Sequence, residues 1–196
     1  MHSIKPRAIR ILTTLTLATL MPMAALAHPG HDVTGAGFMA GLMHPLTGLD
    51  HVLTIVAASL WAAQLQPAGR VMVAGCLGLF VALGALAPVA PPAGPGLEVA
   101  IALTVIGSGI LLAAGRRWPL WATASCAALF ALIHGFAHGA EGLATSASYV
   151  PGLVAATAGL ALTVSFLAAR LQAHRQWLRL IGAVGAITGT VALFNS

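Results

Sequence analysis

Charged side chains are scarce in this chain. Only 7% of its 196 residues are Asp, Glu, Lys or Arg, whereas 59% are hydrophobic. A soluble globular domain needs far more polar surface than this, because its exterior has to face water. The scarcity excludes a soluble protein and predicts an integral membrane protein whose first partner is the lipid bilayer.

Lysine is almost missing, since Lys5 is the only one. A Walker A loop binds phosphates through a lysine, and no stretch between the apolar segments is long enough to fold a nucleotide-binding domain. The formal net charge is +5, but the arginines are scattered at the ends of segments and form no basic patch. Neither a nucleotide nor a nucleic acid is therefore expected as a partner.

Cysteines are also few. Cys76 and Cys126 lie in separate apolar segments and form no Cys-x-x-Cys or Cys/His pattern. This excludes a disulfide framework and a structural zinc site of the usual spacing.

The first 27 residues resemble a secretory signal. They have a basic start, an apolar run at 11–20 and small residues at 25–27. We expect cleavage there, which leaves a single mature domain at 28–196. An uncleaved signal anchor is the alternative, although the apolar run is short for a membrane span. Either form predicts export to the inner membrane of a bacterium.

Six apolar stretches follow, and each is long enough to cross ~30 Å of hydrocarbon as a helix. Their approximate limits are 37–63, 70–88, 97–115, 119–140, 148–170 and 177–195. Five short connectors join these six stretches, and every arginine of the mature chain falls at or beside the first, third or fifth of them. The positive-inside rule then places both mature termini in the periplasm. The predicted fold is an all-α membrane protein, a six-transmembrane helix bundle.

The first expected span contains His44, Asp50 and His51. An ionisable group at membrane depth costs on the order of 3 kcal/mol or more, so such residues are usually functional. On a straight helix the two histidines would stand about 10 Å apart along the axis, too far to share one ion. Either there are two sites, or the helix bends or unwinds at Pro45 and Gly48. A simple kink with Asp50 paired to His51 is a further alternative.

The fourth expected span carries His134, His138 and Glu141 on one helix face. Gly135 and Gly139 beside them allow a neighbouring backbone or a hydrated ion to approach. This span runs opposite to the first, so the two polar clusters are expected at the same depth and are predicted to form one site. Histidines four residues apart also occur as hydrogen-bonding partners between helices, which is the alternative.

Imidazoles and carboxylates together are ligands of divalent transition metals, and the residues alone indicate no more than that. Their pattern resembles the HupE/UreJ family of nickel permeases. The matching motifs are a histidine followed after five residues by Asp50-His51, and His-Gly-x-Ala-His-Gly-x-Glu from His134. Ile133 stands where that family has phenylalanine, a difference that concerns local packing or a gate and leaves the ligands unchanged.

The resemblance implies a multi-pass inner-membrane permease rather than an enzyme. Its substrate would be Ni²⁺, or Co²⁺ in some relatives, and it would supply nickel enzymes such as hydrogenase or urease. No permanently bound cofactor is expected. Without a nucleotide site, transport would be driven by the membrane potential or coupled to another ion.

Two other classes fit part of the pattern. A membrane haem-b protein would ligate iron with one histidine from each of two helices, but it has no use for carboxylates at the iron. An intramembrane zinc hydrolase would need three protein ligands, an activated water and a substrate-sized cavity.

The mature amino terminus carries His28, His31 and Asp32. These residues are candidates for capturing metal outside the membrane and passing it to His44. A solvated tail without structure is the alternative.

Overall fold

The computed structural model describes residues 37–88, 92, 94–140, 147–170 and 174–195. These residues form seven helices and no strand. The helices are α2 (Phe38–Thr47), α3 (Leu49–Ala62), α4 (Pro67–Ala85), α5 (Pro95–Ala113), α6 (Leu120–Ala140), α7 (Tyr149–Arg170) and α8 (Arg175–Asn195). The predicted signal peptide and four candidate ligands, His28, His31, Asp32 and Glu141, lie outside the described residues.

Five of these helices, α4 to α8, are each long and apolar enough to cross a membrane. The pair α2 and α3 passes the same test only when taken together, because the two helices meet at an angle of 78°. The all-helical prediction is therefore confirmed, with five spans, or six when the bent pair is counted as one broken span.

The predicted bend between His44 and His51 is confirmed, and it lies at Gly48. This glycine ends α2 and begins α3 in an extended conformation, with φ −79° and ψ 118°. Its N–H donates to the carbonyl of His44, and its own carbonyl accepts from Val52. Pro45, the other candidate for the break, remains inside α2.

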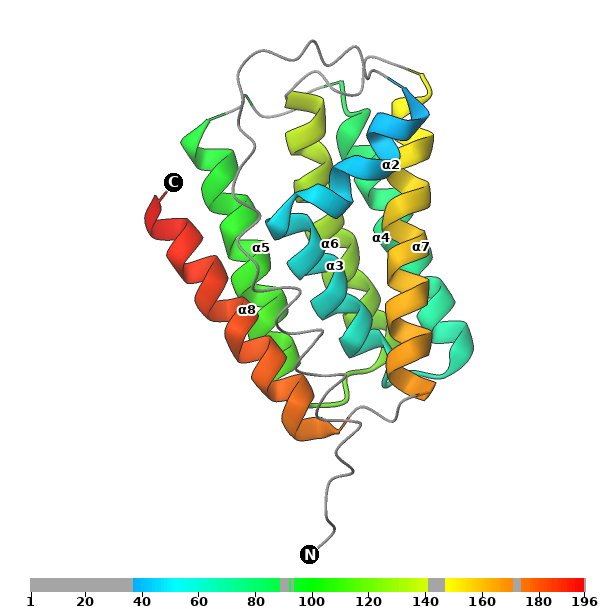
Figure 1. The fold of residues 1–196 in the computed structure, drawn as a ribbon, viewed down its shortest axis with the longest axis vertical. Coiled ribbons are helices and arrows are strands. Elements are labelled where there is room, and N and C mark those ends of the chain that lie inside the picture. Colours follow the sequence, from blue (N-terminus) through cyan, green and yellow to red (C-terminus); the bar gives the residue numbers. More distant parts are fainter. Residues whose placement is uncertain (1–36, 89–91, 93, 141–146, 171–173, 196) are drawn as a thin grey trace, which may run out of the picture. The chain divides into compact units, whose positions relative to one another are not determined.

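The short helix α3 lies at the centre of the bundle. It contacts each of the other six described helices, and nine of its 14 residues are buried. Around it, α2, α5 and α7 begin, and α4 and α6 finish, at the same end of the bundle, the upper end in Figure 1. We refer to this as the outer end, after the side of the membrane that the arginine distribution predicts for it.

Glycines set the spacing between neighbouring helices. A Cβ added to Gly84 of α4 would collide with the backbone of α6, and one added to Gly135 of α6 would collide with α4. Gly41 of α2 and Gly152 of α7 form a second reciprocal contact of this kind. Helices in lipid associate mainly through close packing, because there is no hydrophobic driving force between them. Small residues permit this packing by letting the backbones approach each other. The expectation that a backbone approaches Gly135 is thus confirmed, and the contact fixes α6 beside α4.

Candidate metal centre

The bend at Gly48 places the two histidines of the first motif side by side. The ring centroids of His44 and His51 are 5.6 Å apart and the rings are perpendicular. A straight helix would have separated them by about 10 Å. Breaking the helix thus brings both imidazoles into one centre.

Helix α6 brings its two histidines to the same centre from the opposite direction. His134 and His138 are 3% and 1% exposed, so both are shielded from lipid and from water. The Nε2 atom of His138 lies 3.1 Å from Nε2 of His51, and its ring centroid lies 4.6 Å from that of His44. The two motifs, about 90 residues apart in the chain, therefore meet as predicted.

The potential ligand atoms form two overlapping groups. The outer group consists of His44, His51 and His138, and the inner group consists of Asp50, His51 and His134. Within each group the ligand atoms lie within 4.8 Å of one another. The inner group is farther from the outer end, because His134 precedes His138 by about one turn on a helix that finishes there.

The distances suit coordination of a transition metal. Two ligands that each bind an ion at 2.0–2.1 Å and subtend about 90–110° lie about 2.9–3.4 Å apart. The Nε2 atoms of His51 and His138 are separated by 3.1 Å. In the inner group, Asp50 Oδ2 is 3.0 Å from Nδ1 of His51 and 3.6 Å from Nδ1 of His134. The measured pairs are therefore at or close to the separations that ligands of one ion adopt.

His51 belongs to both groups through opposite ring nitrogens. Its Nε2 faces His138 of the outer group, and its Nδ1 faces Asp50 of the inner group. A neutral imidazole carries one proton and one free lone pair. As a neutral ring, His51 can therefore serve only one group at a time.

Several ring nitrogens at this centre lack hydrogen-bond partners. Within the described part of the chain, Nδ1 of His51, His134 and His138 makes no hydrogen bond. Asp50 is close to Nδ1 of His51, but it lies off the direction in which an N–H on that atom would point. Buried polar atoms are normally paired, and orphaned ones at a functional site call for a missing partner such as an ion.

Known proteins are similar to this chain over most of its length. A family model described as "HupE / UreJ protein" matches residues 15–193. The chain belongs to the HupE/UreJ family. Protein HupE of Rhizobium leguminosarum bv. viciae is 34% identical over 186 residues, which cover 93% of this chain and 96% of that protein. No solved structure matches.

Two residues outside the family motifs also reach the centre. Thr104 of α5 has its hydroxyl oxygen 2.8 Å from Nε2 of His134. Tyr149, at the start of α7, is buried with its ring centroid 6.2 Å from those of His44 and His138. The sequence analysis missed both. The available signal for Thr104 was a polar side chain about 14 Å into a predominantly apolar span, close to the depth of the motifs.

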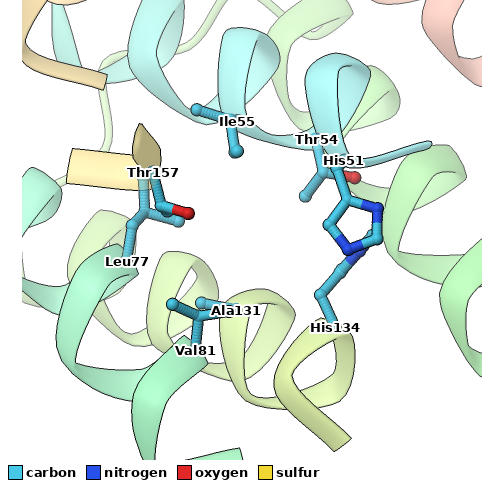
Figure 2. A pocket seen from close by; sticks show the side chains of 8 residues that line it. All are labelled: His51, Thr54, Ile55, Leu77, Val81, Ala131, His134 and Thr157. Carbon is cyan, nitrogen blue, oxygen red and sulfur yellow. The ribbon is translucent and has the colours of Figure 1, made fainter. Parts of the chain in front are cut away.

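A small cavity adjoins the inner group. It is lined by His51 and His134 together with Thr54, Ile55, Leu77, Val81, Ala131 and Thr157, as Figure 2 shows. It offers about 20 Å³ to the centre of a water molecule, and one water needs about 10–15 Å³ on this measure. The cavity therefore has room for about one water molecule.

Of the six motif residues predicted to form one metal site, five come together in this HupE/UreJ structure: His44, Asp50, His51, His134 and His138. The sixth, Glu141, follows the last residue of α6 and lies outside the described residues. The predicted pairing of Asp50 with His51 is also present. It coexists with the shared centre and does not replace it.

Proposed function

We propose that this protein is a multi-pass permease of the bacterial inner membrane that takes up Ni²⁺ through the centre formed by α2, α3 and α6. The observation that carries the proposal is the position of His51, which faces two groups of three potential ligands through opposite ring nitrogens. Two such groups at successive depths form a path, whereas a structural metal site would need only one.

The proposed path begins at the outer group. When Nε2 of His51 holds the ion together with His44 and His138, the ring proton is on Nδ1, close to Asp50. Transfer to the inner group requires the ring to release the ion from Nε2 and to change its tautomer. The proton on Nδ1 passes to water and an equivalent proton from water binds Nε2, so that no proton is gained or lost overall. The freed Nδ1 lone pair would then join Asp50 and His134 around the ion. Binding and proton movement are coupled because the two compete for the same lone pairs.

Charge and voltage favour inward movement of a dication. Asp50 supplies one negative charge at the inner group, and we expect Glu141 to supply a second near the outer end. A dication that crosses a potential of about 100 mV gains roughly 4–5 kcal/mol. This corresponds to an accumulation of roughly a thousandfold, so ATP is not required.

Release toward the inner end requires the bundle to rearrange. One helical turn closer to the inner end, Ile55 of α3 and Ala131 of α6 line the cavity in the positions that would continue the two rows of ligands. An ion leaving the inner group therefore meets apolar side chains, which must move apart before it can pass. A closed inner side also prevents a continuous leak of protons or other cations.

Nickel is preferred to cobalt in the proposal because affinity at imidazole and carboxylate sites generally rises from Co²⁺ to Ni²⁺. Cobalt uptake by the same path is the second candidate. The cargo would supply nickel enzymes such as hydrogenase or urease. We further propose that His28, His31 and Asp32 capture metal outside the membrane, with both mature termini in the periplasm.

The contacts between the histidines argue against a haem protein. Nε2 of His51 and Nε2 of His138 are in direct contact, and the adjoining cavity holds about one water. A haem between two histidines needs space for the whole macrocycle. The same small volume is unfavourable for a hydrolase, which must admit its substrate beside the metal.

The direct test is accumulation of radioactive nickel in a bacterial host that lacks its own nickel transporters. We expect the intact chain to restore uptake, and His44→Ala, Asp50→Ala and His134→Ala each to lower it at least about tenfold at matched expression. The control is His174→Ala, since this exposed histidine lies far from α6 at the start of α8. The intact chain failing to raise nickel uptake, with cobalt uptake restored instead, would transfer the proposal to Co²⁺. Failure with both metals would overturn it.

A further inference from the structure

Helix α5 contributes no ligand to either group, yet one of its side chains touches the centre. Thr104 is 2% exposed, and its Oγ1 lies between two polar atoms. One is Nε2 of His134, at 2.8 Å, and the other is the carbonyl oxygen of Ile101, at 2.7 Å. Both distances are short enough for hydrogen bonds.

The hydroxyl of Thr104 donates to the carbonyl oxygen of Ile101, and this bond determines its role toward His134. The threonine hydroxyl has a single proton, and a carbonyl oxygen can only accept. When the hydroxyl donates to Ile101, its oxygen must accept from His134, so the ring proton of His134 is on Nε2. A neutral imidazole has only one N–H, and Nδ1 of His134 is therefore left with its lone pair. That atom is the one directed at the inner group, 3.6 Å from Asp50 Oδ2.

We propose that Thr104 is a positioning residue that holds the proton of His134 on Nε2 and so keeps Nδ1 free to bind the ion. The inference rests on the proposed function and adds a residue to it from outside the family motifs. Asp50 competes with Thr104, because a carboxylate near Nδ1 attracts a ring proton to that atom. If the proton moved there, His134 would become a hydrogen-bond donor to Asp50, and the inner group would lose a ligand.

The neighbouring histidines are not restrained in this way. His51 and His138 contact each other through their Nε2 atoms, and either ring can be the donor. His134 is thus held in one tautomer by the hydroxyl at its Nε2, whereas the contact of His51 with His138 holds no tautomer of His51 from the Nε2 side. This difference suits a path in which His51 changes partners and His134 receives the ion. Metal-binding histidines usually donate their other N–H to a nearby acceptor for the same reason.

The first test measures the tautomer of His134 in the metal-free protein. Ring ¹⁵N chemical shifts distinguish a protonated from an unprotonated nitrogen, and His134→Asn identifies the signals of this residue. We expect the Nε2–H form in the intact chain and a shift toward the Nδ1–H form in Thr104→Val, which has nearly the same shape without the hydroxyl. An unchanged tautomer in Thr104→Val would overturn the inference. If the valine variant does not accumulate, Thr104→Ala removes the same hydroxyl.

The second test measures nickel binding by the purified full chain. We expect Thr104→Val to weaken binding about 10–100-fold, the usual cost of losing a partner behind a metal-binding histidine. Thr104→Ser keeps the hydroxyl and should restore affinity to within about threefold of the intact chain. The control is Thr188→Val, where an exposed hydroxyl on α8 bonds to its own helix backbone. Equal affinity of the valine and serine variants would contradict the inference.

The two tests separate this inference from the proposed function. An intact chain that neither binds nor transports nickel would remove the proposed function, whatever the state of Thr104. A tautomer that responds to Thr104 in the metal-free protein would still establish the positioning role. Normal nickel uptake by the intact chain, together with a tautomer of His134 that does not respond to Thr104→Val, would overturn this inference and leave the proposed function in place.

Discussion

His51 has the most demanding position of any single residue in this protein. It is 7% exposed and lies between Asp50 on one side and His138 on the other. Its usefulness comes from having two ring nitrogens that can exchange roles, which no carboxylate, thiol or amine offers in the same geometry. Small displacements of this ring should therefore affect both groups together.

A side chain at Gly48 would displace the imidazole ring of His51. A Cβ at this position would stand 2.9 Å from Nδ1 of His51 and 3.2 Å from Oδ1 of Asp50, so the imidazole would have to move. The backbone at Gly48 is extended, a conformation that alanine adopts without strain. We expect Gly48→Ala to weaken nickel binding at least about tenfold while the unfolding temperature in detergent stays nearly unchanged.

The matched control is Gly75→Ala in α4, where an added Cβ meets nothing within 4 Å. It should leave nickel affinity unchanged. Equal affinities of Gly48→Ala and the intact chain would mean that the position of His51 does not control binding.

At the scale of helices, the contact between α4 and α6 determines where the second motif lies. Gly84 and Gly135 let the two backbones touch, and Gly135 lies between His134 and His138 in the chain. We expect Gly135→Ala to destabilise the protein by about 1–3 kcal/mol, because the added methyl group meets backbone that cannot move aside easily. Reversible unfolding in mixed detergent micelles would measure the difference.

Gly159→Ala in α7 is the control for this change, since its added Cβ meets nothing within 4 Å. Alanine is a better helix former than glycine by about 1 kcal/mol, so this variant should be neutral or slightly more stable. Similar stability of the two variants would show that the contact between α4 and α6 is looser than the structure indicates.

The sequence predicted the helices and the bend for identifiable physical reasons. Apolar runs of sufficient length indicate spans, and Pro45 with Gly48 in a polar stretch indicates a broken helix. Which of the two residues carries the break could not be predicted, since both are compatible with one. Thr104 was not predicted because its role depends on α5 lying beside α6, and the pairing of helices in a membrane leaves little trace in hydropathy.

The whole molecule places a short, buried helix at the centre of longer ones. α3 contacts all six other described helices, so that His51 is surrounded by protein, whereas the side chain of Asp50 is partly exposed (Figure 1). This arrangement could not be predicted, because buried and lipid-facing helices are equally apolar. The common depth of the two motifs could be predicted, since it depends only on the number and direction of the spans.

The orientation of the bundle gives a prediction at this scale. The arginine-bearing connectors should face the cytoplasm, and the last helix should finish in the periplasm. Alkaline phosphatase fused after Ser196 should be active, and a fusion after Arg117 should be inactive, because the enzyme folds only after export. The reverse pattern would invert the proposed direction of transport, and activity of both fusions would contradict three membrane crossings between Arg117 and Ser196.

The central claim is that one ion is handed between two groups that share His51. Its most direct measurement is the number of nickel ions bound by the purified chain at saturation, determined together with the affinity by calorimetry. We expect one ion per chain in the intact protein, and loss of measurable binding in His51→Ala, because both groups lose a ligand. Two ions bound at once by the intact chain, or unchanged binding in His51→Ala, would contradict the account.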